Sequence, residues 1–168
     1  AYRFELGGVG RADNGELHTR GKANIVEITA SPTVNNTFLM WGHDNAPQSF
    51  QVADLPPSAL QVSSRLTRTW RVHNGGVGNV DITIHLRELQ GFLDMCVSPE
   101  KFVLIHSPTA NFANASTQKV IGSYAEDAQT ITFTNVSLAN GRYFTLGIGG
   151  DGSTYYVKPV ASGSKDGS

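Results

Sequence analysis

Apolar and polar residues alternate along several short segments of the chain, most clearly within residues 65–86. Every second residue from Val80 to Leu86 is apolar, and the residues between them are polar. A period of two places one set of side chains on a core and the other in water, which is typical of a half-buried antiparallel strand. The preceding segment repeats the pattern in Leu66, Trp70 and Val72, with Arg68 as the exception on the inner face. The glycine-rich turn between the two segments predicts a hairpin.

A second hairpin is predicted near the end of the chain. Ile131 and Phe133 alternate with polar residues, Asn140-Gly141 forms a turn signal, and an alternating run resumes at Phe144. Further strand candidates are residues 24–30, 37–42, 49–52, 101–107 and 118–123, and an apolar run covers 92–97. No segment repeats with a helical period over ten or more positions. The pattern predicts an all-β protein, an antiparallel β-sandwich of Ig-like or jelly-roll-like type.

The length of the chain indicates one domain. Its 168 residues can form a single core without disulfide bonds. We predict one sandwich over 1–160, with N-terminal strands and loops in 1–64 and a hairpin-rich core in 65–150. The small polar residues 161–168 predict a linker or tail. Ala1 is not followed by a signal-peptide pattern, so we expect a mature chain or a piece of a longer one.

Charge and hydropathy narrow the classes of partner. Thirteen Lys and Arg oppose fourteen Asp and Glu, without a basic cluster, so nucleic-acid binding is not expected. No apolar run approaches the ~20 residues of a membrane-spanning helix, so we expect no membrane insertion.

Three residues are assigned to the core from their surroundings. Cys96, the only cysteine, lies in an apolar run and is predicted to pack as a small hydrophobic residue. Trp70 shares its face with apolar neighbours and is predicted to be a core aromatic. A buried Arg68 would need a carboxylate partner, for which Glu88 and Asp94 are the candidates.

The local cluster with the clearest binding chemistry follows a predicted strand. Trp41, His43 and Asp44 bring an aromatic ring, an imidazole and a carboxylate to the strand end. They could line a sugar or peptide site, or His43 and Asp44 could pin a turn by bonding the backbone, which is the interpretation we favour. Tyr143 points away from the Phe144 face and is a further candidate ligand-binding residue.

Metal, cofactor and catalytic signals are weak. Asp13, Asn14 and Glu16 are the candidates for calcium, but one short turn supplies too few ligands, and Asx-turn chemistry explains it better. The G-x-G-x-x-G pattern at 147–152 is not followed by a helix, so we expect no dinucleotide and no other cofactor. No serine stands in a nucleophile elbow, and no zinc spacing occurs among the histidines. We therefore expect a protein that is not an enzyme.

Several motifs together resemble a family of uncharacterised β-sandwich domains from large secreted bacterial surface proteins. They are, in chain order, GGVGRADNGELHTR, TFLMWGHDN, RLTRTWRVHNGGVGNVDITIHL and GRYFTLGIG. The resemblance implies an adhesin-like context beside LamG-like and type 9 secretion sorting domains, and no catalytic residues. The tail YYVKPVASGSKDGS also resembles the lead-in to a right-handed β-helix domain.

Three functional hypotheses follow. The first is a non-catalytic structural or adhesive module of a secreted or cell-surface bacterial protein, which spaces or presents neighbouring domains and contacts surface glycans or protein. The second is a carbohydrate-binding accessory module, favoured by exposed coplanar aromatic rings and opposed by burial of Trp41 and Trp70. The third is a hydrolase domain, which would need a cleft with converging acids or a Ser/His pair.

Overall fold

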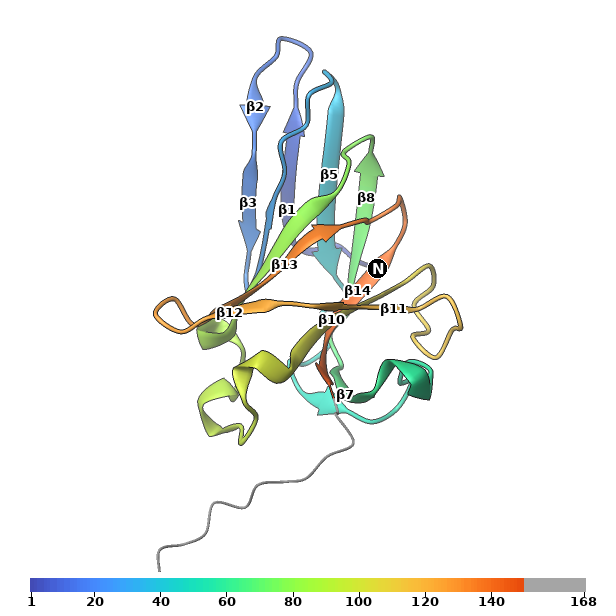
Figure 1. Ribbon diagram of the computed structural model, residues 1–168. Coiled ribbons are helices and arrows are strands. Elements are labelled where there is room, and N and C mark those ends of the chain that lie inside the picture. The colour runs from blue at the N-terminus through green and yellow to red at the C-terminus, as the bar shows by residue number, and fades with distance from the viewer. Residues whose placement is uncertain (150–168) are drawn as a thin grey trace, which may run out of the picture.

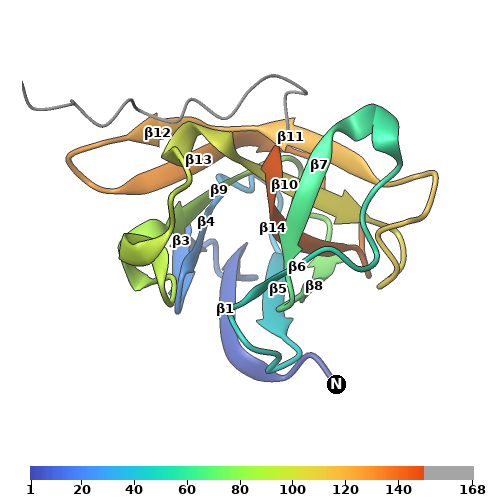
Figure 2. The same cartoon turned by 90° about the horizontal axis from the view of Figure 1, so that it is seen from below.

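The computed structural model describes residues 1–149 and shows two antiparallel sheets packed face to face (Figures 1 and 2). The predicted all-β sandwich is confirmed. The large sheet has the order β11-β10-β14-β8-β5-β1-β2, with β7 beside β14 and β6 beside β7, and the small sheet has the order β12-β13-β9-β4-β3. The strands are β1 (Phe4–Arg11), β2 (Leu17–His18), β3 (Arg20–Ala23), β4 (Val26–Thr29), β5 (Thr37–His43), β6 (Phe50–Gln51), β7 (Val62–Leu66), β8 (Trp70–Gly75), β9 (Val80–His85), β10 (Phe102–Ser107), β11 (Gln118–Ile121), β12 (Ser123–Ala125), β13 (Thr130–Val136) and β14 (Tyr143–Gly149). Four short 3-10 turns, at Ser58–Leu60, Leu86–Glu88, Phe92–Asp94 and Pro99–Lys101, are the only helical elements among these residues.

The core lies between the sheets and is built by the inward-facing half of each alternating strand. Ile82 and Ile84 of β9 face Trp70 and Leu39 of the large sheet in one continuous apolar cluster. The burial of Trp70 confirms its assignment to the core. Removing these side chains from water supplies the main driving force for folding.

Both predicted hairpins are wrong as pairings, although their turns are real. β8 lies in the large sheet and β9 in the small one, and the same separation holds for β14 and β13. Each turn is therefore an arch that carries the chain from one sheet to the other. In an arch and in a hairpin alike, one face of both strands is buried, so the alternation is the same. The true partners of β9 are β4 and β13.

Two continuous segments change sheets and close the sides of the sandwich. β2 pairs with β1 in the large sheet, and the chain then enters β3 of the small sheet. β11 and β12 do the same at the opposite side, where they follow one another across the molecule (Figure 2). Gly122 stands at that crossing, and a β-carbon there would lie 2.6 Å from the Ile131 side chain. The absence of a side chain lets the strand pass directly over the core.

The region after β9 departs from the predicted strands. Residues 92–97 contain a 3-10 turn and irregular chain, and Cys96 is exposed, so its predicted place in the core is wrong. Met95, Cys96 and Val97 are consecutive apolar residues, so their sequence does not show which side chain faces inward. The segment instead covers one end of the core with Phe92 and Met95.

The predicted partners of Arg68 are also wrong. Arg68 lies in the connection before β8, donates to the Ala46 carbonyl at 2.8 Å and approaches Glu5 at 3.7 Å. Glu88 pairs with Lys22 instead. The domain limit at 160, the tail 161–168 and half of the 147–152 glycine pattern lie outside the described residues.

Candidate functional site

The predicted Trp41–His43–Asp44 cluster divides between the core and a turn. Trp41 is buried in the core between the sheets. His43, also buried, accepts from the Asn45 N–H through Nδ1 at 2.9 Å, and its Nε2 lies 2.7 Å from Glu5. Asp44 accepts from the Ala46 N–H at 3.0 Å. These bonds fix the chain where β5 ends and leave Trp41 with no exposed ring.

Tyr143, the fourth predicted residue, lies on the outer face of the large sheet. Its ring meets Tyr2 edge to face at a centroid distance of 5.2 Å, and the Arg71 guanidinium lies 5.4 Å above it. Burial raises the pKa of Tyr2, and the Asp44 carboxylate adds to that rise. Tyr2 and Tyr143 thus lie together on the outer face, while Trp41 and His43 lie inside.

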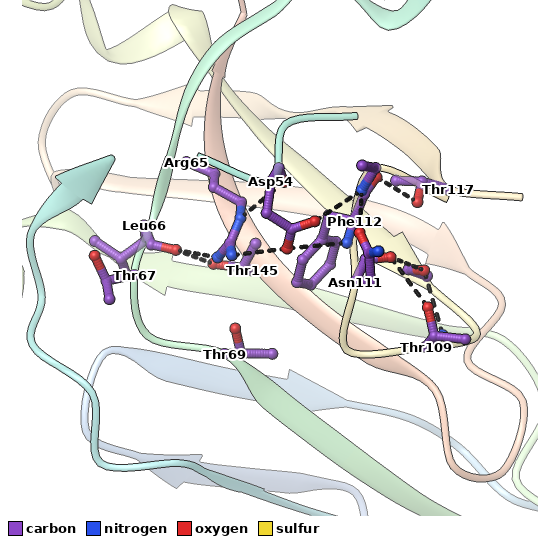
Figure 3. Close-up of polar contacts among 12 residues, drawn as sticks. Asp54, Arg65, Leu66, Thr67, Thr69, Thr109, Asn111, Phe112, Thr117 and Thr145 are labelled. Atoms are coloured by element: carbon purple, nitrogen blue, oxygen red, sulfur yellow. Dashed lines mark hydrogen bonds and ion pairs between the residues drawn. The ribbon is translucent and has the colours of Figure 1, made fainter. Parts of the chain in front are cut away.

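Loops cover the half of this outer face over β7, β10 and β14, and the Arg65–Asp54 ion pair joins these loops (Figure 3). Arg65 of β7, only 6% exposed, donates to Asp54 Oδ2 and to the Leu66 carbonyl, both at 2.9 Å. Asp54 in turn accepts from the backbone N–H groups of Phe112 and Ala113. The Arg65 guanidinium also lies 4.9 Å from the centre of the Phe112 ring. One ion pair between a buried arginine and a partly exposed aspartate therefore fastens two loops over a second apolar cluster that contains Val103 and Ile105.

The other half of the outer face has no such cover. We call it the open face and define it by Leu6 of β1, Phe38 and Met40 of β5, and Arg71 and His73 of β8, all exposed. These strands lie side by side in the large sheet (Figure 1). The open face therefore presents apolar side chains to solvent over the very strands whose opposite side forms the core.

Glycines flank the large side chains of the open face. Met40 stands between Gly8 on β1 and His73 on β8. The Phe38 ring lies over Gly75, where a β-carbon would be 2.8 Å from it, and it stacks on His73 with centroids 5.5 Å apart. The ring is thereby held flat against the sheet and shows its remaining surface to solvent.

Two hollows adjoin Met40, one on each side. The first, about 540 Å³, has a floor of glycine backbone on β1 and is bounded by Phe38, Glu16 and His18. The second, about 330 Å³, is bounded by Tyr2, Leu6, Arg71, His73 and Asn140. Because Met40 borders both, the hollows form one shallow strip across three strands.

The outer face of the small sheet is polar by contrast. Glu27 of β4 receives two hydrogen bonds from Arg20, at 2.7 and 2.9 Å, and one contact from His85 at 3.0 Å. The hydrogen bonds from Arg20 hold the pKa of the Glu27 carboxyl below its usual value. Thr83 and Thr132 bond to each other beside this group. The two outer faces of the sandwich therefore offer opposite surfaces to a partner.

His106 of β10 is buried beside Arg142. Burial lowers the pKa of His106 to about 4, and the positive charge of Arg142 adds to the effect. The Arg142 Nε donates to His106 Nδ1 at 2.7 Å, which requires the neutral imidazole. This histidine is a structural acceptor, and it faces neither hollow.

The pKa of His106 predicts acid sensitivity. The unfolded chain takes up a proton near pH 6.5 that the folded chain takes up only near pH 4, so stability should fall by about 3 kcal/mol between these values. His106→Asn supplies an amide oxygen close to the Nδ1 position and does not titrate. Urea denaturation at pH 7 and pH 4 should show a pH-dependent loss about 3 kcal/mol smaller for the variant. Equal losses in both proteins would assign the acid sensitivity to other groups.

The calcium candidates form the tip of the β1–β2 hairpin. Asp13 Oδ1 accepts from the Asn14 N–H at 2.7 Å, and Asn14 Oδ1 accepts from the Glu16 N–H at 3.0 Å. The Asn14 oxygen thus closes an Asx turn, and the Asp13 oxygen bonds the backbone beside it. Within residues 1–149, no three His, Cys, Asp or Glu side chains gather in a way that could hold a metal ion.

A family model described as Domain of unknown function (DUF8202) matches residues 1–142. The chain belongs to this family. The match spans β1 to β13 and ends just before β14, so the DUF8202 domain includes every strand of the open face. No curated protein and no solved structure matches the chain. The description of the family names no activity, so a function is inferred from the site.

The residues of the open face were not found from the sequence. Phe38, Met40 and their neighbours form a continuous apolar run, so no alternation distinguishes the outward side chains from the inward ones. The structure buries only Leu39 and Trp41 of that run. Glycines at positions 8, 10 and 75, opposite large side chains, are the signal that could have indicated an exposed, accessible sheet face, but their significance depends on strand register.

Proposed function

We propose that this domain is a non-catalytic adhesive module of a secreted or cell-surface bacterial protein, and that the open face is its contact surface. The observation that carries the proposal is the unequal cover of one sheet. Loops seal the half of the outer face over β7, β10 and β14, while Phe38, Met40 and Leu6 remain exposed on the other half. Contiguous exposed apolar side chains on a soluble domain are typical of interaction sites.

The proposal includes no catalytic role because three of the histidines are already bonded to charged side chains. His43, His85 and His106 each bond a glutamate or an arginine. Within residues 1–149, no histidine is hydrogen-bonded to a serine, threonine or cysteine side chain. A nucleophile and its base would need such a bond.

The surface location and the role of presenting neighbouring domains rest on the motif resemblance given above. Among the described residues, no helix is long and apolar enough to span a bilayer. In a longer chain, the sandwich would present the open face on a sheet that one continuous apolar core holds to the second sheet.

Adhesion of coated beads tests the proposal. Beads carrying the 168-residue chain are passed under flow over films of cellulose, chitin, xylan, polygalacturonate and mucin, and retained beads and released reducing ends are counted. We expect retention on at least one film without reducing-end release, and loss of retention for Phe38→Ser/Met40→Ser. Retention that this variant does not change, retention on no film, or release of reducing ends would each refute the proposal.

A further inference from the structure

We propose that the open face binds an acidic polysaccharide, with Phe38 stacking on a sugar ring and Arg71 pairing with a uronic acid carboxylate. This inference rests on the proposed function and names its ligand. The combination of a flat apolar surface with a few polar groups at its border is what carbohydrate and other small-ligand sites share. Each part of the strip contributes one element of that combination.

The Phe38 ring provides the stacking surface. It is 40% exposed, and its plane is fixed by Gly75 beneath and by the His73 ring beside it, which lies at 26° to it. A ring held in place loses little conformational entropy when a ligand settles on it. The glycine floor beside it leaves the first hollow open, so a pyranose ring can approach the sheet closely.

Arg71 provides the charge that selects an anion. Its guanidinium rests on the Tyr143 ring, and no carboxylate pairs with it among residues 1–149. Arg65, by comparison, is neutralised by Asp54. A positive charge left unpaired at the border of an apolar strip is complementary to a ligand carboxylate, which a planar guanidinium binds with two parallel hydrogen bonds.

The other titratable groups along the strip also make its Arg71 end the more positive one. His73 lies between Phe38 and Arg71, and His18 borders the first hollow. Arg11 and Glu16 both border the first hollow, where their opposite charges offset each other, whereas Arg71 stands alone among Lys, Arg, Asp and Glu in bordering the second. The Arg71 end of the strip is therefore the more positive, and the carboxylate belongs there.

The spacing favours a chain over a single sugar. Arg71 is in register with Gly42, four residues along β5 from Phe38, so the two anchors are separated by roughly 13 Å along the strand direction. One pyranose ring does not span that distance. Asn140 and Tyr2 border the second hollow near Arg71 and supply further hydrogen-bonding groups.

Affinity electrophoresis and calorimetry with polygalacturonate test the inference. The fully methyl-esterified polymer, which has the same sugar chain without the carboxylate charges, is the control ligand. We expect the 168-residue chain to bind polygalacturonate at least tenfold more tightly than the ester, and trigalacturonate but not galacturonic acid to compete. Arg71→Gln should remove the preference for the acid form, and Phe38→Ala should weaken binding of both forms at least tenfold. Matched controls are Arg87→Gln, which removes one exposed charge elsewhere, and Ile121→Ala, which removes an exposed apolar residue at the other edge of the same sheet.

The alternatives give different results. Equal binding of acid and ester, or retention of the preference in Arg71→Gln, overturns the role of Arg71 and the anionic ligand. Binding to a different film in the bead assay without binding to polygalacturonate overturns this inference but leaves the adhesive function. Sedimentation that shows a dimer in the wild type and a monomer in Phe38→Ala would mean that a second copy covers the open face, which also overturns it.

Discussion

Replacement of Trp70 by alanine should lower the free energy of unfolding by about 3–5 kcal/mol, the cost of truncating a fully buried aromatic residue. Trp70 is 1% exposed and stacks on Phe144 with a centroid distance of 5.6 Å and an angle of 14°. His43 meets the edge of the same indole at 6.2 Å. The cavity left by alanine would open between the sheets, where strands on both sides prevent collapse. Urea denaturation followed by circular dichroism measures the loss.

Trp70→Phe separates lost packing from a lost hydrogen bond. The Trp70 Nε1 is buried and has no hydrogen-bond partner. Removing it therefore costs no bond, and it relieves an unsatisfied donor. We expect Trp70→Phe to cost less than half as much as Trp70→Ala. A near-neutral Trp70→Ala would contradict the place of this residue in the core, and a Phe variant as unstable as the Ala variant would contradict the packing explanation.

The alternation of residues identified which side chains face inward, but not which strands pair. On β9, Ile82 and Ile84 were assigned to the core correctly, because burial of one face depends only on the residue's own strand. The pairing of β9 with β4 joins segments more than fifty residues apart. Loop-closure entropy and the packing of both sheets decide which distant strands pair. The alternation of neighbouring residues contains no information about either.

Polar residues in the core region were harder to place than apolar ones. Arg68 falls on the inner face by counting from Leu66, but the strand ends at Leu66 and the count does not continue through the turn. The buried arginine is Arg65, whose partner Asp54 lies in a loop of two prolines with no regular pattern. A buried arginine needs a carboxylate beside it, and which carboxylate lies there depends on the tertiary structure.

The candidate site shows the same limit. The sequence drew attention to Trp41, and β5 does carry the aromatic side chains of interest, yet the exposed ring belongs to Phe38 on the opposite face of that strand. Residues 38 and 41 are an odd number of positions apart, so their side chains lie on opposite faces of the strand, and Trp41 is on the core side. Tyr143 was correctly expected on the outer face, and it supports Arg71 at the border of the strip.

The loops that cover the other half of the sheet should depend on Asp54. Asp54→Gly should destabilise the domain by about 3–5 kcal/mol, because it leaves the Arg65 guanidinium buried without its counterion. It also removes the acceptor for the Phe112 and Ala113 N–H groups. Glycine suits the left-handed backbone of residue 54, whose φ is 55°, so the substitution adds no backbone strain.

A double-mutant cycle with Arg65→Met isolates the charge pair. Methionine fills part of the arginine's space without a charge, so removing Asp54 in its presence costs only the two loop hydrogen bonds. We expect the effect of Asp54→Gly to be at least 2 kcal/mol smaller in the Arg65→Met background, measured by urea denaturation. Additive effects would show that Asp54 acts on the loops alone. Because the cycle concerns the covered half of the sheet, neither substitution should change retention of beads by the open face unless the protein unfolds.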